Sequence, residues 1–334
     1  MADRAARRHT LAVRVAVRVA VVAALALLAA CGGQAGDRTD AAFPNGPIRL
    51  LVPFVAGGPT DLTARAYGEF LERELGQPVL VENKPGASGA LATRELITAK
   101  PDGHTLALVT AGTMVLTPLA NDVGYSTADI TALGVMSEVP SVLVVGANSA
   151  HPDVAAFAAA ARARPGAISV AVPGASTPQG IELRRLREQH RVEVTAVPFN
   201  GNAEMTTALL GGNVDAVLIN ASRDVTENID AGRFRPLAVS TEQRLDWLPA
   251  TPTLVEAGFT GLTLSGSTYG LAGPAGLPAP VTARLEEALR RGHTDPGVVA
   301  KIGERYLGPR FLDANQLRAI LDRTRAVYQP ILAK

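Results

Sequence analysis

The chain has 334 residues, with 32 Lys and Arg against 31 Asp and Glu, and a formal net charge of +1. Aromatic residues make up only 4% of it, so it lacks the basic and aromatic surfaces with which proteins hold nucleic acid, and no such partner is expected. A hydrophobic content of 47% together with 32 Gly and 23 Pro indicates a globular α/β chain rich in turns.

The first thirty residues have the pattern of an export signal. Five arginines precede an uninterrupted apolar stretch over residues 19–30, and about a dozen apolar residues are too few for the ~20 that span a bilayer. The run Leu28-Ala29-Ala30-Cys31 resembles the bacterial lipobox. We therefore expect a lipoprotein signal at 1–30, a lipid on Cys31 and a place on the outer face of the cytoplasmic membrane, at the cell surface or in the periplasm. The alternative is an ordinary signal with a chance cysteine.

Cleavage would leave 304 residues with a net charge of −3, since the signal holds five Arg and one Asp. This is longer than one hydrophobic core usually supports, so two domains are expected. Residues 31–43 are too polar to bury much apolar surface and are interpreted as a flexible tether. Cys31 is the only cysteine, so stability must come from core burial and not from an internal disulfide.

From residue 48 onward, short apolar runs alternate with amphipathic segments of helix length. This alternation is typical of an α/β fold in which helices connect parallel strands. The first set predicts strands at 48–54, 79–81, 105–110 and 141–146, with helices from about 62 to 76 and at 88–99.

A second set of similar units begins near residue 154. It predicts helices at 154–163, 178–190 and 202–210, and strands at 168–172, 192–197 and 214–219. A strand at 235–240 would return the chain to the first domain, which a strand at 269–272 and two or three helices complete. The expected division is 44–145 plus 242–334 for the first domain and 146–241 for the second.

Two loops share one pattern. Residues 53–61 follow the first strand, with Gly57 and Gly58 permitting close backbone approach and Pro59 suited to the first helical turn. A helix start offers free N–H groups and partial positive charge, so it can hold a carboxylate without Lys or Arg.

Residues 172–178 repeat this pattern in the second set, where Ser176 and Thr177 add hydroxyl groups. Because each loop lies at the carboxyl end of a strand, we expect the two to face each other across a ligand cleft. The alternative is that Thr60, Asp61 and Thr177 merely cap their helices. For Asp61, capping and ligand contact both stay open.

Seven ordered segments resemble the substrate-binding proteins of tripartite tricarboxylate transporters, the Bug or TctC type. They cover residues 47–65, 81–87, 101–106, 197–201, 210–215, 237–240 and 252–258. The resemblance implies a two-domain Venus-flytrap receptor with a type II periplasmic-binding-protein-like fold. It would capture a small carboxylated solute for integral membrane permease subunits, with no cofactor, no metal and no catalytic residue.

The resemblance also implies that residues 54–61 and 174–177 hold the carboxylate. The expected ligand-binding residues are Phe54, Val55, Ala56, Gly57, Gly58, Thr60, Asp61, Gly174, Ala175, Ser176, Thr177, Phe199, Asn200, Gly201, Asn220 and Tyr269. Two departures concern ligand identity. Thr177, Pro178, Gln179 and Gly180 replace a Gly-Ser element followed by His, and Thr268 stands where a Trp is common, so the solute itself is not inherited.

The sequence lacks the motifs of the common enzyme classes. The chain has no Gly-x-Ser-x-Gly elbow, no dinucleotide or phosphate-loop glycine pattern, and no histidines at zinc-ligand spacing. A secreted hydrolase is therefore the weaker alternative. A sensor that presents its solute to a membrane kinase is the other, and one chain does not separate it from a transport receptor.

Overall fold

The structure, a computed structural model, describes residues 43–263 and 265–332. The predicted signal, the lipid site at Cys31 and the tether up to residue 42 lie outside these residues. Pro44–Lys334 form one compact unit. Among the residues that the structure describes, no helix combines the length and the apolar character needed to cross a bilayer.

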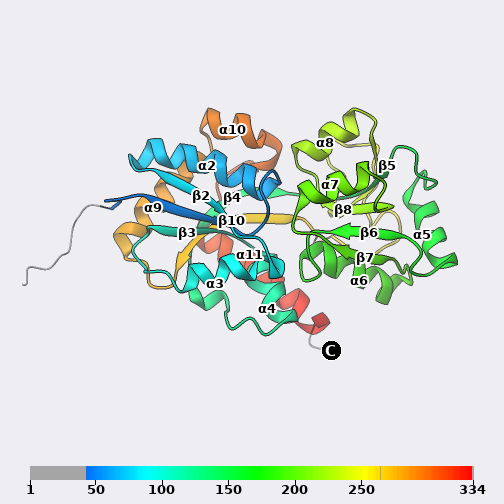
Figure 1. The fold of residues 1–334 in the computed structure, drawn as a ribbon, viewed down its shortest axis with the longest axis horizontal. Coiled ribbons are helices and arrows are strands. Elements are labelled where there is room, and N and C mark those ends of the chain that lie inside the picture. The colour runs from blue at the N-terminus through cyan, green and yellow to red at the C-terminus, as the bar shows by residue number, and fades with distance from the viewer. Residues whose placement is uncertain (1–42, 264, 333–334) are drawn as a thin grey trace, which may run out of the picture. The chain divides into compact units, whose positions relative to one another are not determined.

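Two five-stranded sheets organise the described chain (Figure 1). The first has the order β2-β1-β3-β10-β4, and the second has the order β7-β6-β8-β5-β9. In the first, the strands are β1 (Ile48–Val52), β2 (Val79–Asn83), β3 (Thr105–Thr110), β4 (Ile130–Val139) and β10 (Ser267–Pro274). In the second, they are β5 (Ser141–Gly146), β6 (Ser169–Val172), β7 (Thr195–Pro198), β8 (Ala216–Asn220) and β9 (Phe234–Val239).

Both sheets combine parallel and antiparallel pairs in the same way. β1 is parallel to β2 and β3, while β10 runs antiparallel between β3 and β4. β6 is parallel to β7 and β8, while β5 runs antiparallel between β8 and β9. In each sheet the first parallel strand, β1 or β6, is followed by a loop and a helix, as the alternation of apolar runs and amphipathic segments in the sequence predicts.

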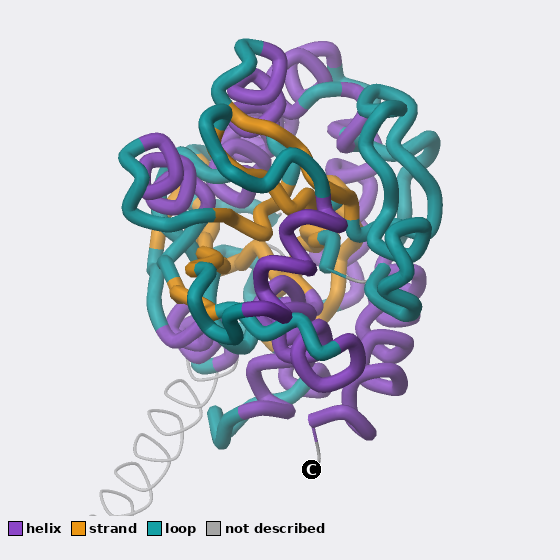
Figure 2. The backbone as a smooth tube through the Cα atoms, turned by 90° about the vertical axis from the view of Figure 1, so that its right-hand side faces the viewer, coloured by secondary structure: helices purple, strands orange, loops and turns teal. Residues whose placement is uncertain are grey.

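Helices enclose each sheet (Figures 1 and 2). We call each sheet with its helices a lobe. The first lobe has α2 (Pro59–Leu75), α3 (Ala90–Ile97), α4 (Thr117–Ala120), α9 (Ala279–Gly292), α10 (Pro296–Ile302) and α11 (Ala314–Leu332), with short turns at Ala87–Gly89, Gly112–Leu116, Thr127–Asp129 and Glu304–Tyr306. The second has α5 (Val154–Ala163), α6 (Pro178–His190), α7 (Asn202–Leu210) and α8 (Arg223–Asp230).

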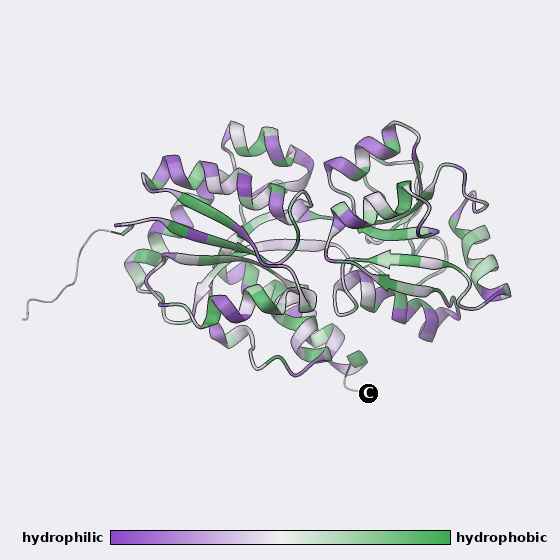
Figure 3. Ribbon diagram, in the orientation of Figure 1, coloured by the Kyte–Doolittle hydropathy of each residue, from purple (hydrophilic) through white to green (hydrophobic). Residues whose placement is uncertain are grey.

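The hydrophobic core lies on both faces of the sheets. In Figure 3 the strands are therefore mostly hydrophobic, and the helices carry both hydrophobic and hydrophilic residues. In the second lobe, Phe157 of α5 and Leu186 of α6 pack on one face, and Met205 of α7 and Val225 of α8 pack on the other. Strands covered on both faces read as continuous apolar runs. The predicted bounds of α5, α6 and α7, at 154–163, 178–190 and 202–210, agree with the structure.

One strand belongs to a different lobe from the one expected. The segment 141–146, expected in the first domain, is β5 of the second sheet, where it pairs with β8 and with β9, the strand expected at 235–240. Pro140 explains the early crossing, because it has no N–H with which to extend the β4 ladder. Leu254 and Leu262 still pack in the second lobe. We propose lobe boundaries near 140 and 266.

Strand β4 was not predicted, although its ten residues form one edge of the first sheet. Its sequence ITALGVMSEV has no regular alternation, and it contains Gly134 with φ +147. A side chain at Gly134 would collide with Phe311 and with the carbonyl of Leu312. The C-terminal segment that contains Phe311 and Leu312 packs against this strand. The strand is therefore stabilised by tertiary packing and not by the local propensity of its residues.

Gly270 provides a test of the packing that positions β10. A Cβ there would lie 2.5 Å from Cδ2 of Leu317, a buried residue of α11. We expect Gly270→Ala to lower the free energy of unfolding by about 1–3 kcal/mol through overpacking. Urea unfolding measures this. Gly146→Ala is the control, because nothing lies within 4 Å of its Cβ position. Equal stability of the two variants would contradict this account.

Candidate functional site

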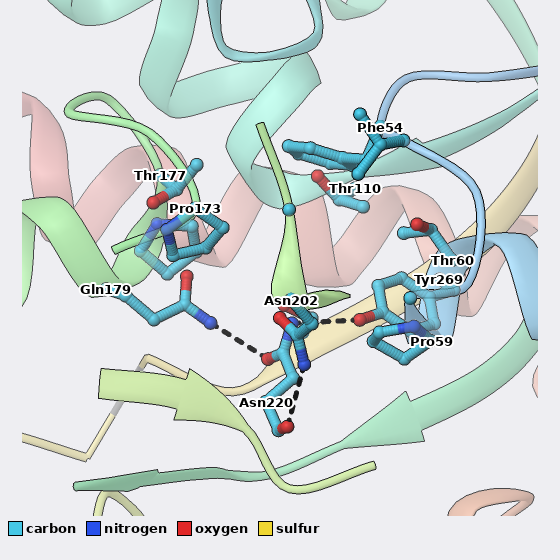
Figure 4. A pocket seen from close by; sticks show the side chains of 15 residues that line it. Phe54, Pro59, Thr60, Thr110, Pro173, Thr177, Gln179, Asn202, Asn220 and Tyr269 are labelled. Atoms are coloured by element: carbon cyan, nitrogen blue, oxygen red, sulfur yellow. Dashed lines mark hydrogen bonds between the residues drawn. The ribbon is translucent and has the colours of Figure 1, made fainter. Parts of the chain in front are cut away.

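A cavity lies between the two lobes (Figure 4). The described residues that line it come from both sheets and include no charged side chain: Phe54, Val55, Gly58, Pro59, Thr60, Thr110, Pro173, Thr177, Pro178, Gln179, Gly201, Asn202, Asn220, Ser267 and Tyr269. Its volume of about 20 Å³ has room for only one or two water molecules. A larger solute requires the lobes to move apart.

Three hydrogen bonds join the two lobes directly. The backbone N–H of Val55 donates to the carbonyl of Asn200 across the cleft at 3.4 Å. Asn121 donates to the hydroxyl oxygen of Ser176 at 2.9 Å, and Arg223 donates to the carbonyl of Ala300 at 2.8 Å. These contacts describe a closed arrangement of the two lobes.

A further contact lies at the seam between the lobes, away from the cavity. Trp247 packs on the core of the second lobe, and the guanidinium of Arg305, from the first lobe, lies 4.9 Å from the centroid of its ring. The ring of Tyr306 meets Trp247 edge to face, with 6.3 Å between centroids.

The first loop is held in place by Asp61. Its carboxylate accepts hydrogen bonds from the Gly57 N–H at 2.9 Å, from Nε of Arg65 at 3.0 Å and from Nδ2 of Asn83 at 3.0 Å. Asn83 also donates to the carbonyl of Phe54 at 3.0 Å. Since the carboxylate is committed to these donors, Asp61 orients the loop and does not line the cavity.

Neither of the two roles considered for Asp61, helix capping and ligand contact, describes the hydrogen bonds that it makes. The N-cap of α2 is Gly58, which has no side-chain cap, and Asp61 bonds to the residue before it. Burial, which leaves Asp61 only 3% exposed, would by itself raise the pKa of its carboxyl group. The hydrogen bonds from Arg65, Gly57 and Asn83 outweigh burial and hold that pKa below its ordinary value of 3.8.

The second loop is closed by Thr177, which is the N-cap of α6. Its hydroxyl donates to the carbonyl of Gly174 at 2.7 Å and accepts from the N–H of Gly180 at 3.4 Å. The Thr177 hydroxyl therefore caps α6, which is the alternative role that the sequence left open. Gly174 has φ +126, and a Cβ there would lie 2.8 Å from Oγ of Ser88 in the first lobe, so only glycine fits this approach of the lobes.

Two helix starts converge on the cavity. Pro59 and Pro178 are the first residues of α2 and α6, and both line it. The first-turn amides of a helix have no intrahelical partner, and the helix dipole adds partial positive charge at that end. The arrangement can stabilise a carboxylate through neutral donors alone.

A network of buried polar side chains forms the floor of the cavity (Figure 4). Nε2 of Gln179 donates to Oδ1 of Asn220 at 2.8 Å, and Nδ2 of Asn220 donates to the Tyr269 hydroxyl at 2.9 Å. Tyr269 is 1% exposed, and burial raises the pKa of its hydroxyl, so it stays protonated. Asn202 donates to the carbonyl of Asn220 at 2.9 Å.

The structure brings half of the expected ligand-binding residues to the cavity. Those that line it are Phe54, Val55, Gly58, Thr60, Thr177, Gly201, Asn220 and Tyr269. Those that do not line it are Ala56, Gly57, Asp61, Gly174, Ala175, Ser176, Phe199 and Asn200. The lining residues that sequence reasoning did not select are Pro59, Thr110, Pro173, Pro178, Gln179, Asn202 and Ser267. Polar side chains beside a helix start were the available signal for Gln179 and Asn202.

Metal binding has no candidate in the part of the chain that the structure describes, where no three His, Cys, Asp or Glu residues are grouped to hold an ion.

Asp61 gives a prediction about pH. Because its folded pKa is lowered, its contribution to stability is present above pH 3.8 and is lost as the pH falls toward the folded value. We expect Asp61→Asn to lower the free energy of unfolding at pH 7 by about 1–3 kcal/mol, with a smaller difference at pH 3. Urea unfolding at both pH values checks this. The control is Asp122→Asn, at an exposed site, and an Asp61→Asn effect that does not change with pH would be inconsistent with this role.

Comparison with known proteins identifies the family. Residues 63–334 match the model of the tripartite tricarboxylate transporter family receptor. The UPF0065 protein in the gbd 5′ region of Cupriavidus necator is 30% identical over 329 residues, which cover 98% of this chain and 97% of that protein.

Two solved structures are similar throughout the described chain. MatC from Rhodopseudomonas palustris, solved with bound malate, has a TM-score of 0.80 at 27% identity and covers 87% of this chain and 100% of its own. The periplasmic binding protein BugD has a TM-score of 0.79 at 28% identity and covers 87% and 98%. These findings confirm the expected fold class, and the family consists of solute-binding receptors and not of enzymes. The chain belongs to the tripartite tricarboxylate transporter receptor family.

Proposed function

We propose that this receptor is an extracytoplasmic lipoprotein that captures a small carboxylated organic solute and delivers it to the membrane subunits of a tripartite tricarboxylate-type transporter. The observation that carries the proposal is the cavity between the lobes, which has no charged lining residue but receives two helix starts. Neutral N–H and hydroxyl donors suit a carboxylate that must be released again, because they bind it without a buried opposite charge.

The contacts across the cleft support capture by closure. The Val55–Asn200 backbone bond joins the lobes directly beside the cavity, and a bound solute would add contacts to both sides. The malate bound to the similar MatC protein supports a carboxylate as the solute class. The proposed ligand contacts are the cavity-lining members of the two loops, together with Asn220 and Tyr269.

Ligand titration tests this function. Malate and other organic acids should raise the melting temperature of the purified protein in a saturable way without being converted, because a ligand of the folded state stabilises it by mass action. Gly58→Val should weaken binding at least about tenfold. Its Cβ would lie 3.7 Å from Asn202 of the other lobe, so the valine methyl groups would enter the cleft.

The backbone at Gly58 is extended, with φ −87, so valine adds no backbone strain and the variant should unfold normally. Gly146→Val, at an open surface site, is the matched control. Product formation without saturable stabilisation would favour a hydrolase, and unchanged affinity in Gly58→Val would remove the first loop from the site.

Membrane anchoring has its own test. If Cys31 is lipidated, Cys31→Ser should move the protein from the membrane fraction to the soluble fraction while leaving ligand affinity unchanged, because Cys31 lies thirteen residues before Pro44, where the compact unit begins. Fractionation of cells followed by detection of the protein measures this. Persistent recovery of the variant with membranes would contradict a lipid anchor at this residue.

A further inference from the structure

The directions of the hydrogen bonds on the cavity floor follow from one backbone carbonyl. The hydroxyl of Ser141 lies 2.7 Å from the carbonyl oxygen of Ser265 and 3.2 Å from Oδ1 of Asn220. The Ser265 carbonyl can only accept and makes the shorter contact, so the single Ser141 proton is used there. The side-chain amide of Gln179 lies 2.9 Å from the same hydroxyl oxygen. Since Ser141 has no second proton, the amide atom that faces it must be the NH₂ group of Gln179.

The same reasoning continues to Tyr269. The other N–H of Gln179 points at Asn220, 2.8 Å away, so the atom that it meets is the Asn220 oxygen. The Asn220 NH₂ group then faces the Tyr269 hydroxyl and donates to it at 2.9 Å. Tyr269 therefore accepts within the network and keeps its own proton for another acceptor.

Asn202 is oriented independently. Its NH₂ group donates to the backbone carbonyl of Asn220 at 2.9 Å and to the hydroxyl oxygen of Ser222 at 3.3 Å. The Asn220 carbonyl oxygen can only accept, so the Asn202 atom that faces it must be Nδ2 and not Oδ1. Both protons of Nδ2 are used in these two bonds, and Oδ1 of Asn202 lies on the opposite side of the amide group.

Two carbonyl oxygens are left over at the cavity. Oε1 of Gln179 points away from Asn220 (Figure 4), and neither it nor Oδ1 of Asn202 accepts a hydrogen bond from any residue that the structure describes. Both side chains are almost fully buried, at 1% and 2% exposed, and both line the cavity. A carbonyl oxygen at the cavity can only accept a hydrogen bond, and a ligand carboxylate has only lone pairs to offer it.

We propose that the solute is a carboxylic acid that also carries a hydrogen-bond donor, a hydroxyl or amino group, which the carbonyl oxygens of Gln179 and Asn202 accept. These two residues then select substituted acids over the unsubstituted acids of the same length. The inference rests on the proposed function and names the class of solute.

Matched pairs of acids test this. Isothermal titration of the full chain compares lactate with propionate, malate with succinate and mandelate with phenylacetate, and includes the amino acids alanine, aspartate and phenylglycine. We expect the donor-bearing member of at least one pair to bind at least about tenfold more tightly, because a site built to pair a donor rejects the analogue that lacks it. The hydroxy and amino arms show which donor is preferred.

The variants Gln179→Met and Asn202→Leu remove the two acceptors with little change in side-chain size. Each should reduce the preference within the pair to less than about threefold, whatever its effect on the affinity for the unsubstituted acid. Asn228→Leu is the matched control, because Asn228 is also a buried asparagine of the second lobe but lies outside the cavity. It should keep the full preference.

The outcomes separate the two levels of inference. Binding of acids with equal affinity within every pair would overturn the donor requirement and leave the receptor function standing. A preference that survives in both Gln179→Met and Asn202→Leu would overturn their assignment as selecting residues. No binding of any acid by the wild-type protein would contradict the proposed function itself. The wild-type pairs alone decide the donor requirement if a variant does not fold.

Discussion

A carboxylate that leaves water loses strong hydration, and in this cavity no side-chain charge replaces it. For the carboxylate solute proposed above, the donors would therefore have to be numerous and fixed before the ligand arrives, because each donor that has to be reoriented reduces the net gain of binding. The Asp61 carboxylate fixes the first loop through Gly57 and Asn83, and Thr177 fixes the second through Gly174. The Asp61 carboxylate and the Thr177 hydroxyl thus serve to fix the loops, and the donors for the ligand are backbone N–H groups and neutral side chains.

This division of work explains which parts of the site were predictable. The glycines and prolines that shape a strand-to-helix turn are visible in the sequence, so both loops were placed between the right strand and helix, and α6 begins at the predicted Pro178. The individual contacts were less visible. Asp61 and Ser176 have the chemistry of ligand donors or acceptors, but their partners, Arg65 and Asn121, become apparent only when the chain is folded.

The residues that were missed share a physical cause. Gln179 and Asn202 lie in the first turns of amphipathic helices, where a polar side chain normally faces solvent, and only the approach of β5 and β8 buries them. Likewise β4 and the lobe of β5 depend on long-range pairing and on Pro140, and neither follows from periodicity. Fold class came from local pattern, whereas lobe membership and the cavity floor came from tertiary contacts.

The seam contact formed by Trp247, Arg305 and Tyr306 has a practical consequence. Trp247 is the only tryptophan in the chain, and its two neighbours belong to the opposite lobe. Indole emission responds to a nearby cation and to hydration, so the tryptophan fluorescence of the unlabelled protein originates where the lobes meet. The molecule carries its own optical probe of lobe separation, and no dye or engineered label is needed to observe it.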